Sequence, residues 1–289
     1  MFVVVSSLAK DFHSHAVLDM LKNIPDLTWT PGIPEKFLGK SEEHVRRFFM
    51  PKIGSSVNDK THMVGAAPDS FSWVEEKPEC IVIRDQDQCG SCWAFSSVGP
   101  FADNRCFSGK DATRQLYSEQ YMVSCDKGSD GCAGAYFLQA PQHFLKKTGV
   151  PTDKCVSYKS GKTNITGKCP TTCDDQTPLV LFKSAGFADV CTSEESIKVA
   201  LTQGSLQTSF TVYTDFAYYT KGIYQHKFGP QEGGHAVTMV GYGEEKGVKY
   251  WIIRNSWGPS WGEAGYFRML RGVNECNIEH QCFLTNAFE

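Results

Sequence analysis

The cysteines constrain this chain more than any other feature of its sequence. It has 12 cysteines in 289 residues, and all of them lie between Cys80 and Cys282. They do not form the paired Cys-x-x-Cys clusters of zinc modules, and histidines are not interleaved with them at ligand spacing. The pattern predicts a disulfide framework made in an oxidising compartment, and it leaves the N-terminal quarter of the chain outside that framework.

Composition and charge exclude several classes of function. The chain is 41% hydrophobic, which is enough for a substantial core in one or two domains. Its formal net charge is −3 and no basic run stands out, so we expect no nucleic-acid partner. No stretch reaches the ~20 apolar residues of a membrane span, so we expect no membrane partner. The apolar stretch at residues 2–9 is either a very short signal or a truncated start.

Three zones differ in their hydrophobic pattern. In residues 1–67, apolar side chains recur at helical spacing near 18–24 and again near 45–49, after a candidate N-cap at Ser41. The second zone, 80–185, carries helical patterns near 92–105 and 118–123.

The second zone contains a proline within a helical pattern, and the third zone has the pattern of strands. Gly99-Pro100 should kink the first helix of the second zone, because a proline removes one helical hydrogen bond. The third zone alternates as strands at 236–240, 250–253 and 265–270.

The most specific motif is Cys89-Gly90-Ser91-Cys92-Trp93, preceded by Gln86. It resembles the nucleophile motif of papain-family cysteine proteases, and the resemblance covers residues 68–289. The alternative, that Cys92 is one more disulfide partner, is weakened because the flanking residues also match. A thiol at a helix N-terminus beside an imidazole forms a thiolate–imidazolium pair, which is the attacking species of this family.

The downstream residues that this chemistry needs are also present. Gly233-Gly234-His235-Ala236 supplies the general base, and Asn255-Ser256-Trp257-Gly258 supplies an amide that would orient the imidazole. By resemblance, Gln86 donates to the oxyanion together with the Cys92 backbone N–H. Trp257 would shield the His235–Asn255 bond from water.

Several segments look like the cathepsin B branch of the family, namely 213–216, 222–226, 270–279 and the cysteines of 125–173. Carried over by position, the family's bridges are Cys80–Cys106, Cys89–Cys132, Cys125–Cys169 and Cys155–Cys173. This set leaves Cys92 free, as the mechanism requires. The pairing of Cys191, Cys276 and Cys282 stays open, and we adopt Cys191–Cys282 with Cys276 unpaired as the working choice.

The resemblance also assigns substrate-binding positions. These are Gly90, Gly134, Ala135, Phe137, Gly234, Ala236, Trp257 and Gln281. Ala133-Gly134-Ala135 stands where the family has Asn-Gly-Gly, so the methyl of Ala135 would crowd the backbone bonds to a P2 residue. Gln281 stands where cathepsin B has a carboxylate that pairs with a P2 arginine, so we expect apolar P2 residues to be favoured.

Cathepsin B releases C-terminal dipeptides through an occluding loop that carries paired histidines. The corresponding residues here, 156–168, contain no histidine. We therefore expect the occluding loop to be lacking and the enzyme to be an endopeptidase.

The resemblance implies a papain-like α+β fold. A helical left subdomain would bear Cys92, and a β-barrel-like right subdomain would bear His235 and Asn255. It implies a cysteine endopeptidase that acts through an acyl-enzyme, on peptide and protein substrates, with no cofactor and no metal. The protein would be a monomer, open to cystatin-type inhibitors, in a lysosome-like or vacuolar compartment or secreted. The alternatives are a catalytically inactive homologue that acts as a binding protein and a thiol acyltransferase.

Residues 1–67 are expected to be an inhibitory propeptide, with a short or truncated signal at the start, and residues 68–289 the catalytic domain. Cleavage would occur near Ala66-Ala67-Pro68. The segment holds four of the chain's eight histidines, which are His13, His15, His44 and His62. Histidine gains charge between pH 7 and 5. Because net attraction between the two parts would rise in acid, an acid switch would have to act through a buried histidine at their contact.

Overall fold

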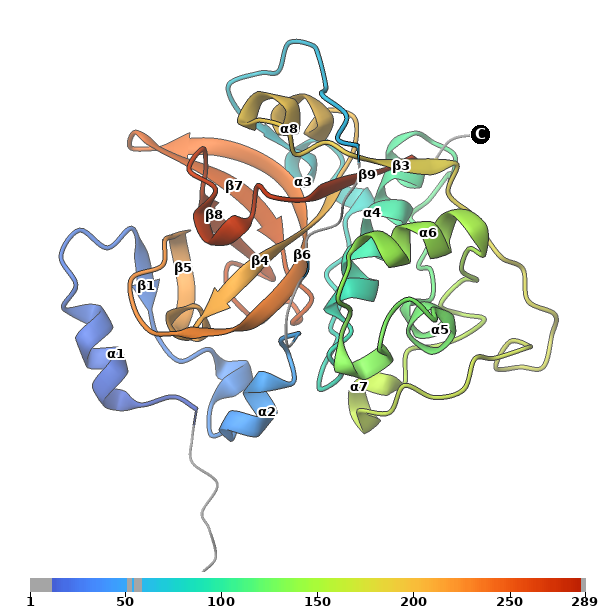
Figure 1. The fold of residues 1–289 in the computed structure, drawn as a ribbon, viewed down its shortest axis with the longest axis horizontal. Coiled ribbons are helices and arrows are strands. Elements are labelled where there is room, and N and C mark those ends of the chain that lie inside the picture. The colour runs from blue at the N-terminus through green and yellow to red at the C-terminus, as the bar shows by residue number, and fades with distance from the viewer. Residues whose placement is uncertain (1–11, 51–53, 55–58, 287–289) are drawn as a thin grey trace, which may run out of the picture.

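The computed structural model describes residues 12–50, 54 and 59–286. Two subdomains lie side by side, one built mainly of helices and the other mainly of strands (Figure 1). The expected signal at the start of the chain lies outside the described residues.

The helical subdomain is built around one buried helix, α4 (Cys92–Phe107), with α5 (Glu119–Cys125), α6 (Gln139–Lys147) and the short α7 (Ser160–Thr163) around it. Almost every side chain of α4 is buried, so this helix has no solvent face. The side chain of Ser118 caps α5 by accepting from the backbone N–H of Tyr121. Both helices expected in this zone are present.

The strands form one sheet in the order β1-β5-β8-β7-β6-β4-β9-β3, and β2 pairs with β6. Their bounds are β1 Trp29–Pro31, β2 Phe71–Ser72, β3 Gly186–Asp189, β4 Leu206–Tyr213, β5 Tyr219–Tyr224, β6 Gln231–Glu245, β7 Val248–Arg254, β8 Tyr266–Leu270 and β9 Cys282–Asn286. All pairings between these strands are antiparallel except that of β5 with β8. The three expected strands match β6, β7 and β8.

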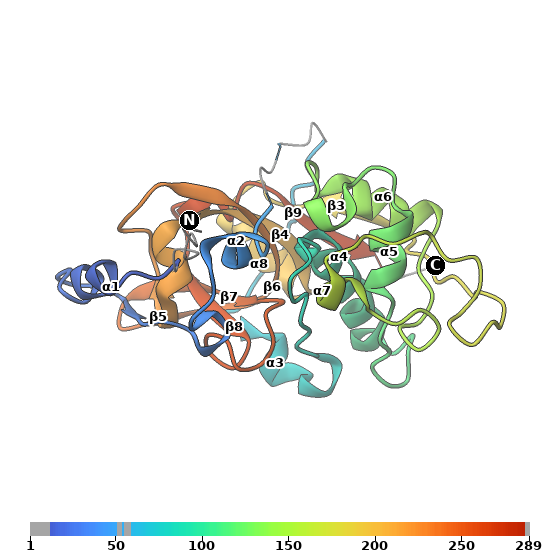
Figure 2. The same cartoon turned by 90° about the horizontal axis from the view of Figure 1, so that it is seen from below.

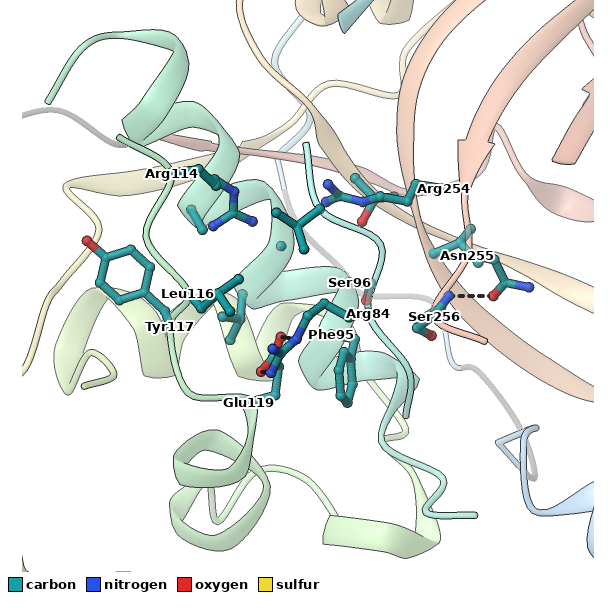
Figure 3. Close-up of a pocket in the computed structure, with 17 residues that line it drawn as sticks. Arg84, Phe95, Ser96, Arg114, Leu116, Tyr117, Glu119, Arg254, Asn255 and Ser256 are labelled. Atoms are coloured by element: carbon teal, nitrogen blue, oxygen red, sulfur yellow. Dashed lines mark hydrogen bonds and ion pairs between the residues drawn. The ribbon is translucent and has the colours of Figure 1, made fainter. Parts of the chain in front are cut away.

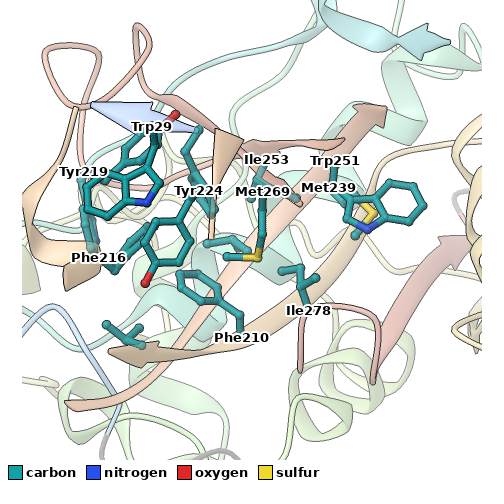
Figure 4. Packing of buried hydrophobic residues seen from close by; sticks show 14 of the residues in the cluster. Trp29, Phe210, Phe216, Tyr219, Tyr224, Met239, Trp251, Ile253, Met269 and Ile278 are labelled. Carbon is teal, nitrogen blue, oxygen red and sulfur yellow. The ribbon is translucent and has the colours of Figure 1, made fainter. Parts of the chain in front are cut away.

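Aromatic side chains fill the interior of the strand subdomain. Phe210, Phe216, Tyr219 and Trp251 lie fully buried together with sulfur and aliphatic side chains of β6, β7 and β8 (Figure 4). Edge-to-face and tilted ring contacts dominate, as quadrupoles favour. The short helices α3 (Trp73–Glu76) and α8 (Glu194–Leu201) lie at the outside of this sheet.

The described part of the N-terminal segment, residues 12–50, 54 and 59–67, packs along the strand subdomain and reaches the junction of the two subdomains (Figure 2). It contains α1 (His15–Lys22), β1, and α2 (Glu42–Arg46). Both predicted amphipathic helices are present, and Ser41 caps α2 by accepting from His44 N–H. The 3-10 turns of the described chain are Glu35–Phe37, Pro78–Cys80, Gly131–Ala133, Thr214–Tyr218 and Glu275–Asn277.

Five disulfides join Cys80–Cys106, Cys89–Cys132, Cys125–Cys169, Cys155–Cys173 and Cys191–Cys282. Cys92 and Cys276 are the free cysteines. The expected pairing is therefore present throughout, including the bridge that the resemblance left open. Within the described residues, no helix is long and apolar enough to cross a membrane.

Helix α4 runs from Cys92 to Phe107 with Pro100 inside it, so the position of the predicted kink falls within one continuous helix. The glycine has a steric reason, because a Cβ at position 99 would lie 2.7 Å from a guanidinium nitrogen of Arg254. That guanidinium reaches past Gly99 to bind Asp103, one turn further along the helix.

Candidate active site

Cys92 is the first residue of α4, and its thiol is fully buried where the two subdomains meet. A helix N-terminus carries partial positive charge, which favours a thiolate over a thiol. The backbone N–H of Ala236, from β6 of the other subdomain, is within hydrogen-bonding reach of this sulfur. The thiol is therefore placed against the residue that follows His235.

His235 lies on β6, and its ring is fixed on two sides. Its Nε2 lies 2.7 Å from Asn255 Oδ1, directly after β7. Because that oxygen can only accept, Nε2 carries the proton of a neutral ring. The indole of Trp257 stacks on the imidazole with ring centroids 4.7 Å apart, which excludes water from the bond. Nδ1 is buried and has no hydrogen-bond partner among the described residues.

Burial shifts the pKa of each of these two groups in the direction that opposes a thiolate–imidazolium pair. It raises the pKa of Cys92 to about 12 and lowers the pKa of His235 to about 4. Backbone N–H groups oppose the first shift, and Asn255 opposes the second. Burial in this docked form therefore works against the thiolate and against the imidazolium, because neither charge is solvated.

Gln86 lies six residues before Cys92 in the chain and is fully buried. Its backbone N–H donates to Ser256 O at 2.8 Å, and its Oε1 accepts from Ser256 Oγ at 2.7 Å. The amide nitrogen is left to donate toward the site, where it contacts Cys89 O at 3.1 Å and Phe48 O at 3.5 Å. A side-chain amide held in this way is a ready donor to an oxyanion.

The N-terminal segment covers this site. Met50 forms an isolated antiparallel bridge with Gly234, with both N–H···O distances 2.8 Å. Its side chain is buried in the same cluster as Cys92 and Ala236. Further along the segment, Gly54 N–H donates to Tyr136 O at 2.7 Å, and Gln281 Nε2 donates to Gly54 O at 3.3 Å.

Several predicted substrate-binding residues contact this segment. Gly234 pairs with Met50, Gln281 binds Gly54, and Trp257 packs against Phe48. Ala135 is buried, Phe137 is 42% exposed, and Gly90 N–H donates to Cys132 O. Gly134 has φ +111°, a conformation that a side chain disfavours, so the family's glycine is retained where the backbone needs it.

A cavity of about 270 Å³ lies beside Gly54 and Gly234. It is lined mostly by polar residues, and the full set is Gly54, Ser209, Phe210, Thr211, Gln231, Gly233, Gly234, Asn277, His280 and Gln281. Of the predicted substrate-binding residues, Gly234 and Gln281 are in this lining, and Phe137 and Ala236 are not. The polar floor was missed, because no local pattern in 209–211 or 277–280 marks these residues as neighbours.

Ion pairs lie close to Asn255, around a small interior cavity (Figure 3). Arg254, next to Asn255, binds Asp103 of α4 through both Nη atoms, and Arg114 binds the same carboxylate. Arg84 binds Glu119 of α5. The Arg254–Asp103 pair joins the helical subdomain to the end of β7, next to Asn255, and none of these ion pairs was predicted.

The geometry can be compared with known proteins. A family model described as "Papain family cysteine protease" matches residues 67–285. The chain belongs to the papain family of cysteine proteases. It is 50% identical to "Cathepsin B-like CP3" of Giardia intestinalis, over 88% of this chain and 87% of that one. It is 34% identical to "Cathepsin B-like cysteine proteinase 5" of Caenorhabditis elegans, over 92% and 88%.

Solved structures agree with this assignment. The chain is similar to "proCathepsin B S9 from Trypanosoma congolense", with a TM-score of 0.87, 28% identity, and coverage of 96% of this chain and 99% of that one. The α+β, papain-like fold expected from the sequence is therefore confirmed, and the chain is a cathepsin B-like cysteine protease. The matched Trypanosoma structure is a proform, and the match extends over most of the N-terminal segment.

Proposed function

We propose that this protein is the zymogen of an endopeptidase in which Cys92 is the nucleophile and His235 the general acid and base. The observation that carries the proposal is a free, buried thiol at a helix N-terminus. It lies against the backbone N–H of Ala236, the neighbour of His235, and the Nε2 of His235 is bound to Asn255. Asn255 would orient the ring without taking its proton, because an amide oxygen only accepts.

The reaction then follows from these atoms. The Cys92 thiolate attacks the scissile carbonyl carbon, and the carbonyl π electrons move to oxygen. His235 gives its proton to the leaving amine as the C–N bond breaks, which leaves a thioester. It next takes a proton from water as that water attacks the thioester, and the acid product leaves as the thiolate re-forms. Gln86 Nε2 and the Cys92 N–H would stabilise the oxyanion in both steps.

We propose that residues 1–67 are the inhibitory propeptide. Three contacts support this role: the Met50–Gly234 bridge, the approach of Phe48 O to Gln86 Nε2, and Gly54 between Tyr136 and Gln281. A peptide chain in this position denies the cleft to substrate, and it buries the reactive pair in its neutral form. The cleavage site near Ala66-Ala67-Pro68 is supported by exposure of residues 64–66 and by the start of the family match at 67.

The packing of residues 156–168 supports the proposal that the enzyme is an endopeptidase. Ser160 is buried, and its Oγ contacts Gln120 Nε2 at 2.8 Å. Cys155–Cys173 and Cys125–Cys169 tie both ends of the segment to the helical subdomain. A segment held there leaves the cleft open to long chains. Slow release of C-terminal dipeptides relative to internal cleavage of a blocked peptide supports this proposal, and rapid stepwise dipeptide release contradicts it.

The proposed P2 preference is for apolar side chains over arginine. Gln281 offers a neutral amide where a carboxylate would pair with arginine, and its Oε1 is buried without a hydrogen-bond partner among the described residues. A charge-assisted bond is roughly twice as strong as a neutral one, so arginine would gain less here than in cathepsin B. The five disulfides support folding in the secretory pathway, for a lysosome-like or vacuolar compartment or for secretion.

The central test uses the two free cysteines as a matched pair. Cys92→Ala should abolish hydrolysis of fluorogenic peptides and labelling by a peptidyl epoxide. Cys276→Ala, the same change at the other free thiol, should leave both near wild type. Hydrolysis near the wild-type rate by Cys92→Ala would overturn the proposal.

A further inference from the structure

Tyr158 connects two parts of the catalytic centre that the mechanism treats separately. It lies in the segment 156–168, just before α7. Its hydroxyl donates to Gln86 O at 2.8 Å and lies 2.7 Å from Ser91 Oγ, which donates to it in turn. One phenol thus joins the backbone of the amide donor to the residue that precedes Cys92.

Packing of the Tyr158 ring holds its hydroxyl at these two partners. Its ring packs edge-on against Phe95 of α4, with centroids 4.9 Å apart. Burial raises the pKa of Tyr158, so the hydroxyl remains a protonated donor at every pH at which the enzyme could work.

A second contact places the same segment against the same turn. Gln88 N–H donates to Gly161 O at 3.1 Å. A Cβ at Gly161 would lie 2.9 Å from Asp87 Cβ and 3.0 Å from Gln86 O, so only a glycine allows this approach. Asp87 itself has φ +49°, a conformation that external contacts must maintain. The turn that presents Gln86 is therefore shaped by residues 158–161.

The other supports of Gln86 come from the opposite subdomain. Ser256 binds its backbone N–H and its Oε1. Tyr158 binds its backbone carbonyl from the helical side. We propose that Tyr158 is a positioning residue for the oxyanion hole, which fixes the Gln86 amide and the Cys92 N–H relative to one another. This inference rests on the proposed function.

The test is Tyr158→Phe, which keeps the ring on Phe95 and removes only the hydroxyl. We expect kcat for peptide hydrolysis to fall about 3- to 10-fold with KM unchanged, the range that one hydrogen bond of ordinary net strength corresponds to. A peptide aldehyde, whose adduct with Cys92 carries an oxyanion, should bind more weakly by a similar factor. Alkylation of Cys92 by iodoacetamide, which forms no oxyanion, should keep its wild-type rate.

Two controls make the outcome decisive. Tyr242→Phe removes the same kind of bond, from a tyrosine hydroxyl to Pro68 O at 2.9 Å, far along β6 from His235, and should change none of the three measurements. Ser91→Ala should reproduce part of the loss in kcat.

The inference is overturned if Tyr158→Phe keeps its kcat and aldehyde affinity, or if iodoacetamide alkylation slows by the same factor as hydrolysis. A wild-type protein without Cys92-dependent hydrolysis would instead remove the proposed function, and the inference with it.

Discussion

Trp29 anchors the N-terminal segment to the strand subdomain, and its removal should open the zymogen. It is 3% exposed and packs between the rings of Tyr219 and Tyr224, at centroid distances of 6.3 and 5.4 Å. Its Nε1 donates to Gln225 O at 3.0 Å, and its strand β1 extends the sheet at β5. None of these partners belongs to the segment itself.

The magnitude follows from this burial. Replacing a buried tryptophan by alanine costs about 3–5 kcal/mol. Here the whole cost falls on the docked state, because Trp29 is solvated once the segment is released. The fraction of open molecules should therefore rise roughly 150- to 5,000-fold, because every 1.4 kcal/mol is about a factor of ten. Labelling of Cys92 by a peptidyl epoxide at pH 7 measures this fraction. The labelled protein must still run on a gel at the size of the uncleaved zymogen.

Two further variants and one control test the reasoning. Trp29→Phe keeps a ring and loses the bond to Gln225, so it should lie between wild type and Trp29→Ala. Leu38→Ala changes a side chain of the same segment that is 66% exposed, and it should label at the wild-type rate. After cleavage all of these proteins should share one kcat. Equal labelling rates for Trp29→Ala and Leu38→Ala would refute this account of latency.

Three other predictions concern the site and its pH dependence. His235→Ala should abolish peptide hydrolysis, whereas Asn255→Ala should retain a partial rate, both measured with a fluorogenic peptide on protein of unchanged thermal stability; full activity of His235→Ala would contradict the mechanism. Gln281→Glu should raise kcat/KM for a P2-Arg substrate relative to its P2-Leu counterpart, and an unchanged ratio would remove Gln281 from the P2 site. His44→Gln should flatten the acceleration of zymogen processing between pH 7 and pH 5, followed by gel; an unaltered profile would exclude this histidine as the switch.

The sequence predicted those parts of the site that local patterns encode. Cys92, His235 and Asn255 lie in motifs whose neighbours all match, so each could be placed without coordinates. Contacts between distant segments could not be predicted. The pairing of Met50 with Gly234 has no signal in either residue. The contact of Gly99 with Arg254 could not be predicted either, because sequence spacing does not show what fills the space beside a glycine.

Burial of the reactive pair does not by itself make latency depend on pH. In the docked form Cys92 has a pKa of about 12 and His235 of about 4, so the pair holds one proton, on sulfur, between these values. In an open cleft of this family the thiolate pKa is about 3–4, and the pair again holds one proton, now on the imidazole. Both states bind the same number of protons through most of the acid range, so linkage gives this site no slope there.

An acid switch must therefore lie in a group that loses proton affinity when the segment docks, and His44 meets this condition. Burial lowers its pKa below 6.5, helped by the charges of Lys40, Arg47 and Lys36 and opposed by Asp87. Its ring packs against Phe48, next to the site. Since the released segment binds this proton more readily, docking is favoured above pH 6.5 and weakens as the pH falls below it. One proton can change the docking equilibrium by no more than about tenfold per pH unit.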